Sequence, residues 1–133
     1  MKYLICLSVI FWGLQVYSQD TSNYECRQYR TGKFTYIDSS TGFMIRVERT
    51  KRHQREYNDF TKVWIDFKIE WVTDCQYELR QLSSNSKLIR KFNHVVTTVV
   101  ISKPLGQEGY EYTCACKGIP ANERVKGLMS VTE

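Results

Sequence analysis

The stretch from Lys62 to Leu82 constrains the fold of this chain more than any other part of the sequence. Apolar residues alternate with mostly polar ones on both sides of a turn signal at Thr73-Asp74. Successive side chains of a β-strand point to opposite faces, so this pattern predicts a β-hairpin with one buried face. That face is predicted to carry Val63, Ile65, Phe67, Ile69, Trp71, Cys75, Tyr77 and Leu79.

Shorter segments with strand character lie on both sides of this hairpin, and short connections join them. They cover residues 33–37, 43–47, 54–57, 94–102, 110–116 and 125–131, whereas residues 87–92 suit either a helical turn or an extended connection. About eight sequential strands predict an all-β antiparallel meander. We expect a small up-and-down barrel of lipocalin-like form, because closure removes exposed strand edges. A two-layer β-sandwich is the alternative.

The N-terminus predicts export. Residues 1–18 combine a positive start at Met1-Lys2, an apolar run and small or medium residues before a cleavage point near Ser18. An apolar run of about fourteen residues is short for a membrane span, which needs about 20. We therefore expect a signal peptide, a single domain over residues 19–133, no membrane span after cleavage, and a secreted or periplasmic location.

Four cysteines follow the predicted cleavage point, and an even number in an exported chain indicates disulfide bonds. They are Cys26, Cys75, Cys114 and Cys116. Spacing alone leaves three connectivities open. Cys114 and Cys116 share one strand face and resemble a metal or redox pair. However, no cysteine or histidine cluster completes a four-ligand site, so structural disulfides are favoured and no metal is predicted.

Motifs of catalysis are missing from the sequence. It contains no nucleophile elbow, phosphate-binding loop or zinc-protease helix motif, and His53 and His94 lack partners at motif spacing. The acidic residues of the predicted hairpin fall on its polar faces. We therefore predict a protein that is not an enzyme and that uses no cofactor.

A basic cluster precedes the hairpin, at Arg46, Arg49, Lys51, Arg52 and Arg55. Glu48 and Glu56 interrupt it, and no aromatic residues alternate with it in the way that base stacking requires. The cluster is therefore predicted to be a solvated edge strand, whose charge opposes aggregation, and no nucleic-acid partner is expected.

Tyrosine provides the ligand hypothesis, because a ring with a polar tip suits the mouth of a ligand-holding barrel. Such rings equally suit a closed core with hydroxyls at its rim. The candidate ligand-binding residues are Tyr36, Tyr57, Tyr77, Tyr110, Tyr112 and Trp71. The first hypothesis is a binding protein for a small apolar or amphiphilic ligand. The alternative is a module that contacts another envelope or extracellular protein, and an enzyme is the third hypothesis. An interior cavity of about 300 Å³ or more favours the ligand, and a filled interior favours the module.

Two motifs carry a family resemblance. They are Cys26-x2-Tyr29-x-Thr31-Gly32-Lys33-Phe34-x-Tyr36 and Trp71-x2-Asp74-Cys75-x-Tyr77-x-Leu79, with Ile45-Arg46 and Gln54-x-Glu56-Tyr57 between them. The chain resembles a group of short exported proteins from Bacteroidetes-type bacteria, some of which carry the name DNA topoisomerase IV. An exported chain of this size, without a nucleotide or DNA-cleavage motif, does not support that name.

The resemblance fades after Leu82 and brings no established activity with it. It does imply a disulfide between Cys26 and Cys75, because the matching positions occur together in the group. Cys114 and Cys116 are then local additions. Their sulfurs, two residues apart on a strand, would bridge only with distortion.

Overall fold

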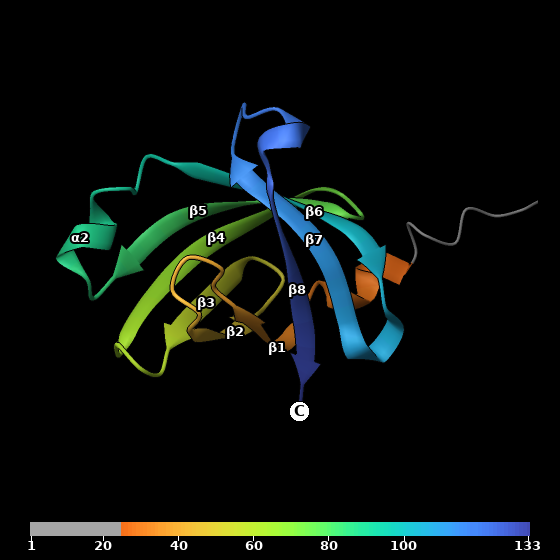
Figure 1. Cartoon of the computed structure of the whole chain (residues 1–133), viewed down its shortest axis with the longest axis horizontal. Coiled ribbons are helices and arrows are strands. Elements are labelled where there is room, and N and C mark those ends of the chain that lie inside the picture. Colours follow the sequence, from red (N-terminus) through yellow and green to blue (C-terminus); the bar gives the residue numbers. More distant parts are fainter. Residues whose placement is uncertain (1–24) are drawn as a thin grey trace, which may run out of the picture.

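A computed structural model describes residues 25–133 of the chain as one closed sheet (Figure 1). The signal peptide expected over residues 1–18 lies outside the described residues. The strands are β1 (Gly32–Ile37), β2 (Met44–Arg49), β3 (His53–Asn58), β4 (Val63–Thr73), β5 (Gln76–Ser84), β6 (Val96–Pro104), β7 (Gly109–Cys116) and β8 (Val125–Thr132).

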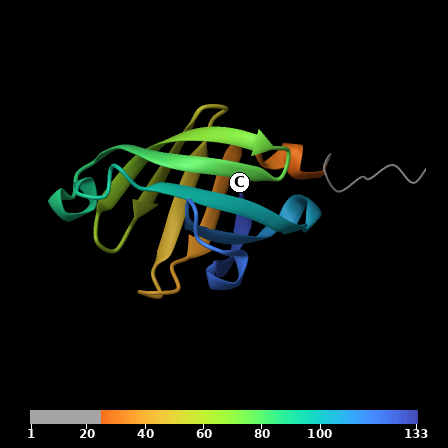
Figure 2. The same ribbon diagram turned by 90° about the horizontal axis from the view of Figure 1, so that it is seen from above.

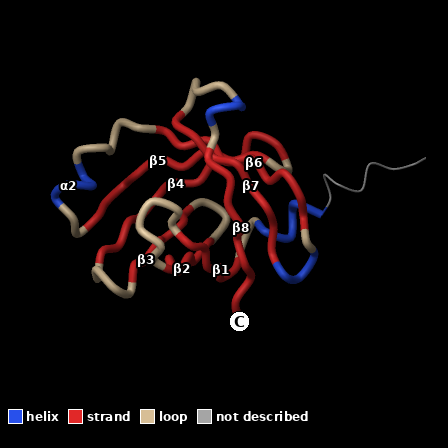
Figure 3. The backbone as a smooth tube through the Cα atoms, in the orientation of Figure 1, coloured by secondary structure: helices blue, strands red, loops and turns tan. Residues whose placement is uncertain are grey.

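Each strand pairs antiparallel with its neighbour in the chain, and β1 pairs with β8 to close the barrel. The closing register places Phe34 opposite Val131. The all-β, eight-stranded barrel is therefore confirmed, and closure through β1 and β8 rules out the two-layer sandwich. Strands account for most of the described chain, with helical turns confined to the connections and to the segment before β1 (Figure 3).

The predicted hairpin is formed by β4 and β5, and its expected inner face points into the barrel. Ile69, Tyr77 and Leu79 are buried, and Phe67 and Trp71 pack against the same core. The turn falls at Asp74 and Cys75, one residue later than predicted. Two register irregularities in β4 bend this long strand around the barrel.

Short helical turns complete the two ends of the barrel. They are η1 (Arg27–Tyr29), α2 (Lys87–Arg90), η2 (Gly106–Glu108) and η3 (Ala121–Glu123). η1 and α2 lie at opposite ends of the long axis (Figure 2). The helix α2 resolves the ambiguity over residues 87–92, and Ser86 caps it by accepting a hydrogen bond from the Ile89 amide. No helix within residues 25–133 is both long enough and apolar enough to cross a membrane.

The Cys26–Cys75 disulfide ties η1 to the turn between β4 and β5, with 5.2 Å between the Cα atoms. The pairing implied by the resemblance is thus present. Cys114 and Cys116 are free thiols, which corrects the expectation that all four cysteines form disulfides. Two residues along a strand span about 7 Å, at the upper limit of disulfide spacing. The register also places Val99 and Thr97, not cysteines, opposite them on β6.

Candidate functional site

A buried arginine lies at the end of the barrel that carries η1, and it holds this end together. We call it the closed end. Arg49 continues the inward alternation of Ile45 and Val47 on β2 and is 3% exposed. Its guanidinium donates to the Gln54 side-chain oxygen (2.8 Å) and to the Tyr29 carbonyl (2.7 Å). It also donates to the Tyr77 and Tyr110 hydroxyls, each at 3.0 Å. The sequence-based prediction that Arg49 belongs to a solvated basic strand is therefore wrong.

Aromatic rings surround the same guanidinium. Its central carbon lies 4.8 Å from the ring centroid of Phe34, 4.7 Å from that of Tyr77 and 5.9 Å from that of Trp71. Ring faces attract cations, and Arg is the more weakly hydrated of the two long basic side chains. The rings and the hydrogen bonds together replace the water that the buried charge has lost.

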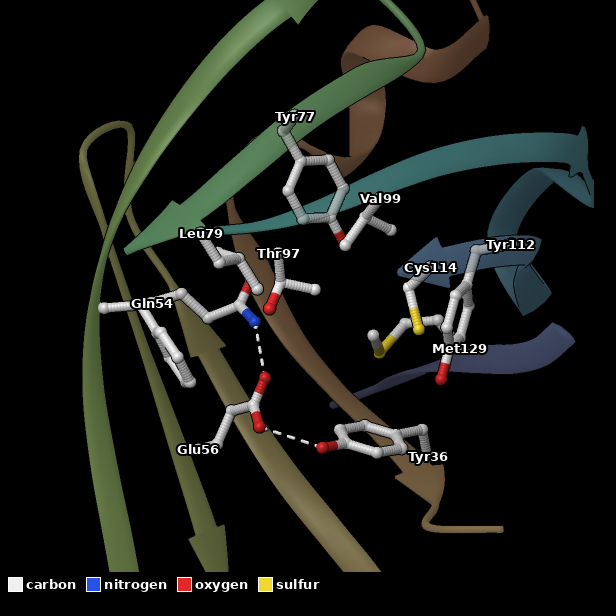
Figure 4. A pocket seen from close by; sticks show the side chains of 11 residues that line it. Tyr36, Gln54, Glu56, Tyr77, Leu79, Thr97, Val99, Tyr112, Cys114 and Met129 are labelled. Atoms are coloured by element: carbon white, nitrogen blue, oxygen red, sulfur yellow. Dashed lines mark hydrogen bonds between the residues drawn. The ribbon is translucent and has the colours of Figure 1, made fainter. Parts of the chain in front are cut away.

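A carboxylate on the neighbouring strand β3, that of Glu56, lies near this arginine. Glu56 accepts hydrogen bonds from the Tyr36 hydroxyl on one oxygen and from the Gln54 amide on the other, both at 2.8 Å (Figure 4). Gln54 thereby bridges Arg49 and Glu56. Burial raises the pKa of the Glu56 carboxyl, while the hydrogen bonds from Tyr36 and Gln54 oppose that rise.

An inner cavity of about 200 Å³ opens beside Glu56 (Figure 4). Its polar wall includes Glu56, Thr97 and Cys114. Burial also raises the pKa of the Cys114 thiol, which disfavours the reactive thiolate. The apolar part of the wall consists of Phe67, Leu79, Val99 and Met129.

A second pocket, of about 420 Å³, forms the mouth of the barrel at the α2 end. It shares Tyr36 and Glu56 with the inner cavity, so their hydrogen bond lies between the two spaces. The remaining walls of the mouth pocket are mainly apolar and include Phe43, Ile45, Val63, Ile65, Leu88 and Ile89. Both spaces are thus mainly apolar, and Glu56 places a carboxyl group in the wall of each.

Exposed apolar side chains surround this mouth. Phe43 stacks on Phe60, with ring centroids 4.6 Å apart, and Phe60 is 77% exposed. Leu88 on α2 is 66% exposed. Large apolar groups exposed at the rim of a pocket often mark a binding surface.

The structure brings together three of the six predicted ligand-binding residues. Tyr36, Tyr77 and Tyr112 all line the inner cavity. The rings of Tyr36 and Tyr112 meet edge to face, with centroids 6.5 Å apart. In Figure 4 the Tyr36 hydroxyl points toward Glu56.

Of the other three predicted residues, Tyr57 borders the mouth pocket, and Tyr110 and Trp71 line neither space. Tyr110 is fully buried at the closed end, where its hydroxyl lies 3.0 Å from that of Tyr77. Trp71 borders a different pocket, beside Arg30 near the η1 end. Tyr57 borders the mouth pocket but faces outward from β3. The central guanidinium carbon of Arg46 lies 4.8 Å from the centroid of its ring.

Sequence reasoning missed Arg49, Gln54 and Glu56, which are the central polar groups of the site. The available signal was the period of two on β2, which places Arg49 on the same face as Ile45 and Val47. The rest of the basic cluster lies outside this network. Arg46 and Arg55 pair with Asp59 and Asp66 on the outer surface.

Gly127 allows Tyr112 to lie against β8. A Cβ atom at Gly127 would come within 2.4 Å of the Tyr112 ring carbon Cζ. We expect Gly127→Ala to displace this ring into the inner cavity and to lower the free energy of unfolding by about 1 to 3 kcal/mol. Urea denaturation would measure the loss. Leu128→Ala, at the neighbouring exposed position, is the control, and equal losses in both variants would contradict the expectation.

The raised pKa of Glu56 predicts a pH effect on stability. An acid whose pKa is higher in the folded state keeps its proton longer there than in the unfolded chain. As the pH rises above the ordinary glutamate pKa, about 4.3, stability should therefore fall until the folded-state pKa is passed. Glu56→Gln removes this effect.

Urea denaturation of wild type and Glu56→Gln at a series of pH values would test the sign. The difference in unfolding free energy, wild type minus variant, should decrease with rising pH in that window. The other carboxyl groups contribute to both proteins alike, including Asp66, whose pKa is lowered by its hydrogen bond from Arg55. A difference that is independent of pH would contradict a raised Glu56 pKa.

Within residues 25–133, no group of three or more His, Cys, Asp and Glu side chains is arranged to hold a metal ion.

Comparison with protein families matches residues 23–74 to the model described as "Firmicute plasmid replication protein (RepL)". The match covers less than half of the chain, and its described part is η1 and β1 to β4, one side of a closed sheet. Comparisons with curated proteins and with solved structures gave no match.

Proposed function

We propose that this barrel is an exported binding protein for a small amphiphilic ligand. The observation that carries the proposal is the pair of adjacent spaces that share Tyr36 and Glu56 as lining residues. Ligand sites are typically concave and mostly apolar, with a few convergent polar groups that fix orientation. The ligand's polar group is placed beside Glu56 and its apolar part extends toward the mouth.

The volumes define the size of this ligand. The inner cavity, at about 200 Å³, is smaller than the roughly 300 Å³ at which typical ligand sites begin. The mouth pocket, at about 420 Å³, exceeds that size. A ligand that uses both spaces places a small polar group inside and a longer apolar part between Val63, Ile65 and Leu88.

Binding without catalysis is part of the proposal. Glycoside hydrolysis uses a pair of carboxylates. Among the described residues that line the inner cavity, Glu56 is the one carboxylate, and Gln54 and Tyr36 occupy both of its oxygens with hydrogen bonds. This arrangement suits recognition of a polar group better than proton transfer to a substrate.

Export is supported by the Cys26–Cys75 disulfide, because disulfides persist mainly in oxidising compartments. The N-terminal sequence of the mature protein tests this part. A chain that begins near residue 19 in the periplasmic or extracellular fraction is expected. An intact Met1 in the cytoplasmic fraction would contradict it.

Native mass spectrometry of protein purified from its own host tests ligand binding directly. The wild type should carry a non-protein mass that is released on denaturation. Val99→Phe fills the inner cavity and should abolish this mass, whereas Val100→Phe, on the outward-facing neighbour, should retain it. Thermal denaturation verifies that both variants fold. A wild type that carries no ligand and binds no amphiphile would contradict the proposal.

The exposed apolar rim favours a second candidate function, a module that contacts another envelope or extracellular protein. Phe60 and Leu88 would be its central contacts, since large apolar groups dominate protein interfaces. Phe60→Ser together with Leu88→Ser should abolish co-purification of such a partner. Phe60→Ser alone leaves every residue that lines the two spaces unchanged and should still carry the small molecule.

A further inference from the structure

We propose that the polar group of the ligand is a cation, a protonated amine or an alkylammonium, held by Glu56 between aromatic rings. This inference rests on the proposed function and names its ligand class. Three features of the site carry it, namely the placement of Glu56 relative to the buried Arg49, the unused acceptor sites of the carboxylate, and the rings of the cavity wall.

The half-buried Glu56 and the buried Arg49 lie on different sides of Gln54. Glu56 lines both the inner cavity and the mouth pocket. Arg49 borders neither space, and Gln54, Tyr29, Tyr77 and Tyr110 accept hydrogen bonds from its guanidinium. A ligand that enters from the mouth therefore meets a carboxylate and is separated from the guanidinium by a side-chain amide and two phenols. An anionic ligand is repelled and a cationic one is attracted.

The Glu56 carboxylate also has acceptor sites to offer. An ionised carboxylate has about four lone-pair sites. Tyr36 uses one site on the first oxygen, and Gln54 uses one on the second. A protonated amine brings three N–H donors and can use the remaining sites without displacing Tyr36 or Gln54.

Aromatic rings make up much of the surrounding wall. Tyr36, Tyr77, Tyr112 and Phe67 all line the inner cavity. Ring faces attract alkylammonium groups, and the attraction grows when the cation is removed from water. Burial raises the pKa of Glu56, and a cation beside it would lower that pKa again. The site thus combines the two groups that recognise organic cations, a carboxylate and ring faces.

The mouth pocket explains why an amphiphilic amine fits better than a free one. Phe43, Ile45 and Val63 line the path outward from Glu56. Because this pocket adjoins the inner cavity at Tyr36 and Glu56, an apolar chain attached to the bound polar group would lie in it. Binding of the chain adds the burial of apolar surface to the attraction between the charges.

Calorimetric titration with three octyl compounds tests the inference. Octylamine, octanol and octanoate share one chain and differ only in the charge of the polar group. The mature disulfide-bonded protein, freed of ligand by denaturation and refolding, is titrated with each compound below its micelle concentration. Octylamine should bind about tenfold to a hundredfold more tightly than octanol, the range expected for a hydrogen bond to a buried charge. Octanoate should bind most weakly.

Glu56→Gln keeps the shape of the side chain and removes its charge. It should reduce octylamine affinity by about tenfold or more and leave octanol affinity nearly unchanged. Glu48→Gln, an exposed glutamate on the outer face of β2, is the matched control and should bind octylamine like the wild type.

The possible outcomes separate this inference from the proposed function. Octanol or octanoate binding as tightly as octylamine would overturn the cationic ligand class and leave an amphiphile-binding barrel. Failure of all three compounds would overturn both. If Glu56→Gln fails to fold, the comparison of the three compounds on the wild type still decides the question.

Discussion

Replacing Arg49 by methionine is expected to lower the free energy of unfolding by about 3 to 5 kcal/mol, the largest effect of any single substitution considered for this barrel. Methionine fills a similar volume but donates no hydrogen bond. Gln54 and the Tyr29 carbonyl would then lose their donor, and the hydroxyls of Tyr77 and Tyr110 would retain only each other. Buried polar groups without partners cost about 1 to 3 kcal/mol each.

Arg46→Met is the matched control for this experiment. Arg46 lies three residues earlier on the same strand but faces outward, pairs with Asp59 and lies over the Tyr57 ring. Exposed ion pairs contribute about 0 to 1 kcal/mol, so this substitution should have little effect. Urea denaturation followed by tryptophan fluorescence would measure both variants. Equal losses at Arg46 and Arg49 would show that the buried network does not hold the closed end.

The contrast between these two arginines shows which parts of the fold the sequence can predict. Alternation revealed the strands, because each strand of a small barrel has one face in the core and one in water. It also identified the inner face of the hairpin correctly, since Ile69 and Leu79 are apolar. The sequence predicts which face of a strand points into the barrel wherever the inward side chains are apolar.

β3 is the strand where that argument could not work. Its inner face carries Gln54 and Glu56, and its outer face carries Arg55 and Tyr57. From the sequence alone, burial of Tyr57 looks less costly than burial of Glu56. The polar inner face is stable only because its partners come from other strands. Tyr36 lies 20 residues before Glu56, and Tyr110 lies 61 residues after Arg49.

The same reason limits prediction of the site. Three of the six predicted aromatic residues line the inner cavity, because aromatic residues on inner faces are frequent in this chain. The position of a tyrosine along the barrel axis decides its role. Some tyrosines line the cavity, and some accept hydrogen bonds from Arg49. Tyr110 and Tyr112 are neighbours on one strand face, yet the first belongs to the arginine network and the second to the cavity.

Removal of the Cys26–Cys75 disulfide is expected to lower the free energy of unfolding by about 4 kcal/mol. The bond joins residues separated by 49 positions, so it restricts a long loop of the unfolded chain. It also holds η1 against the barrel, where Tyr29 accepts a hydrogen bond from Arg49 through its carbonyl. The double variant Cys26→Ser, Cys75→Ser should therefore also release one partner of the buried guanidinium.

Urea denaturation with and without reductant separates the role of this bond from that of the free thiols. Reductant should destabilise the wild type and the Cys116→Ser control by the same amount, because Cys116 is unpaired. It should leave the double variant unchanged, since that protein has already lost the bond. Reductant that destabilised the double variant too would place the effect at another cysteine. Reductant that left the wild type unchanged would show that strand closure, and not the cross-link, holds η1 in place.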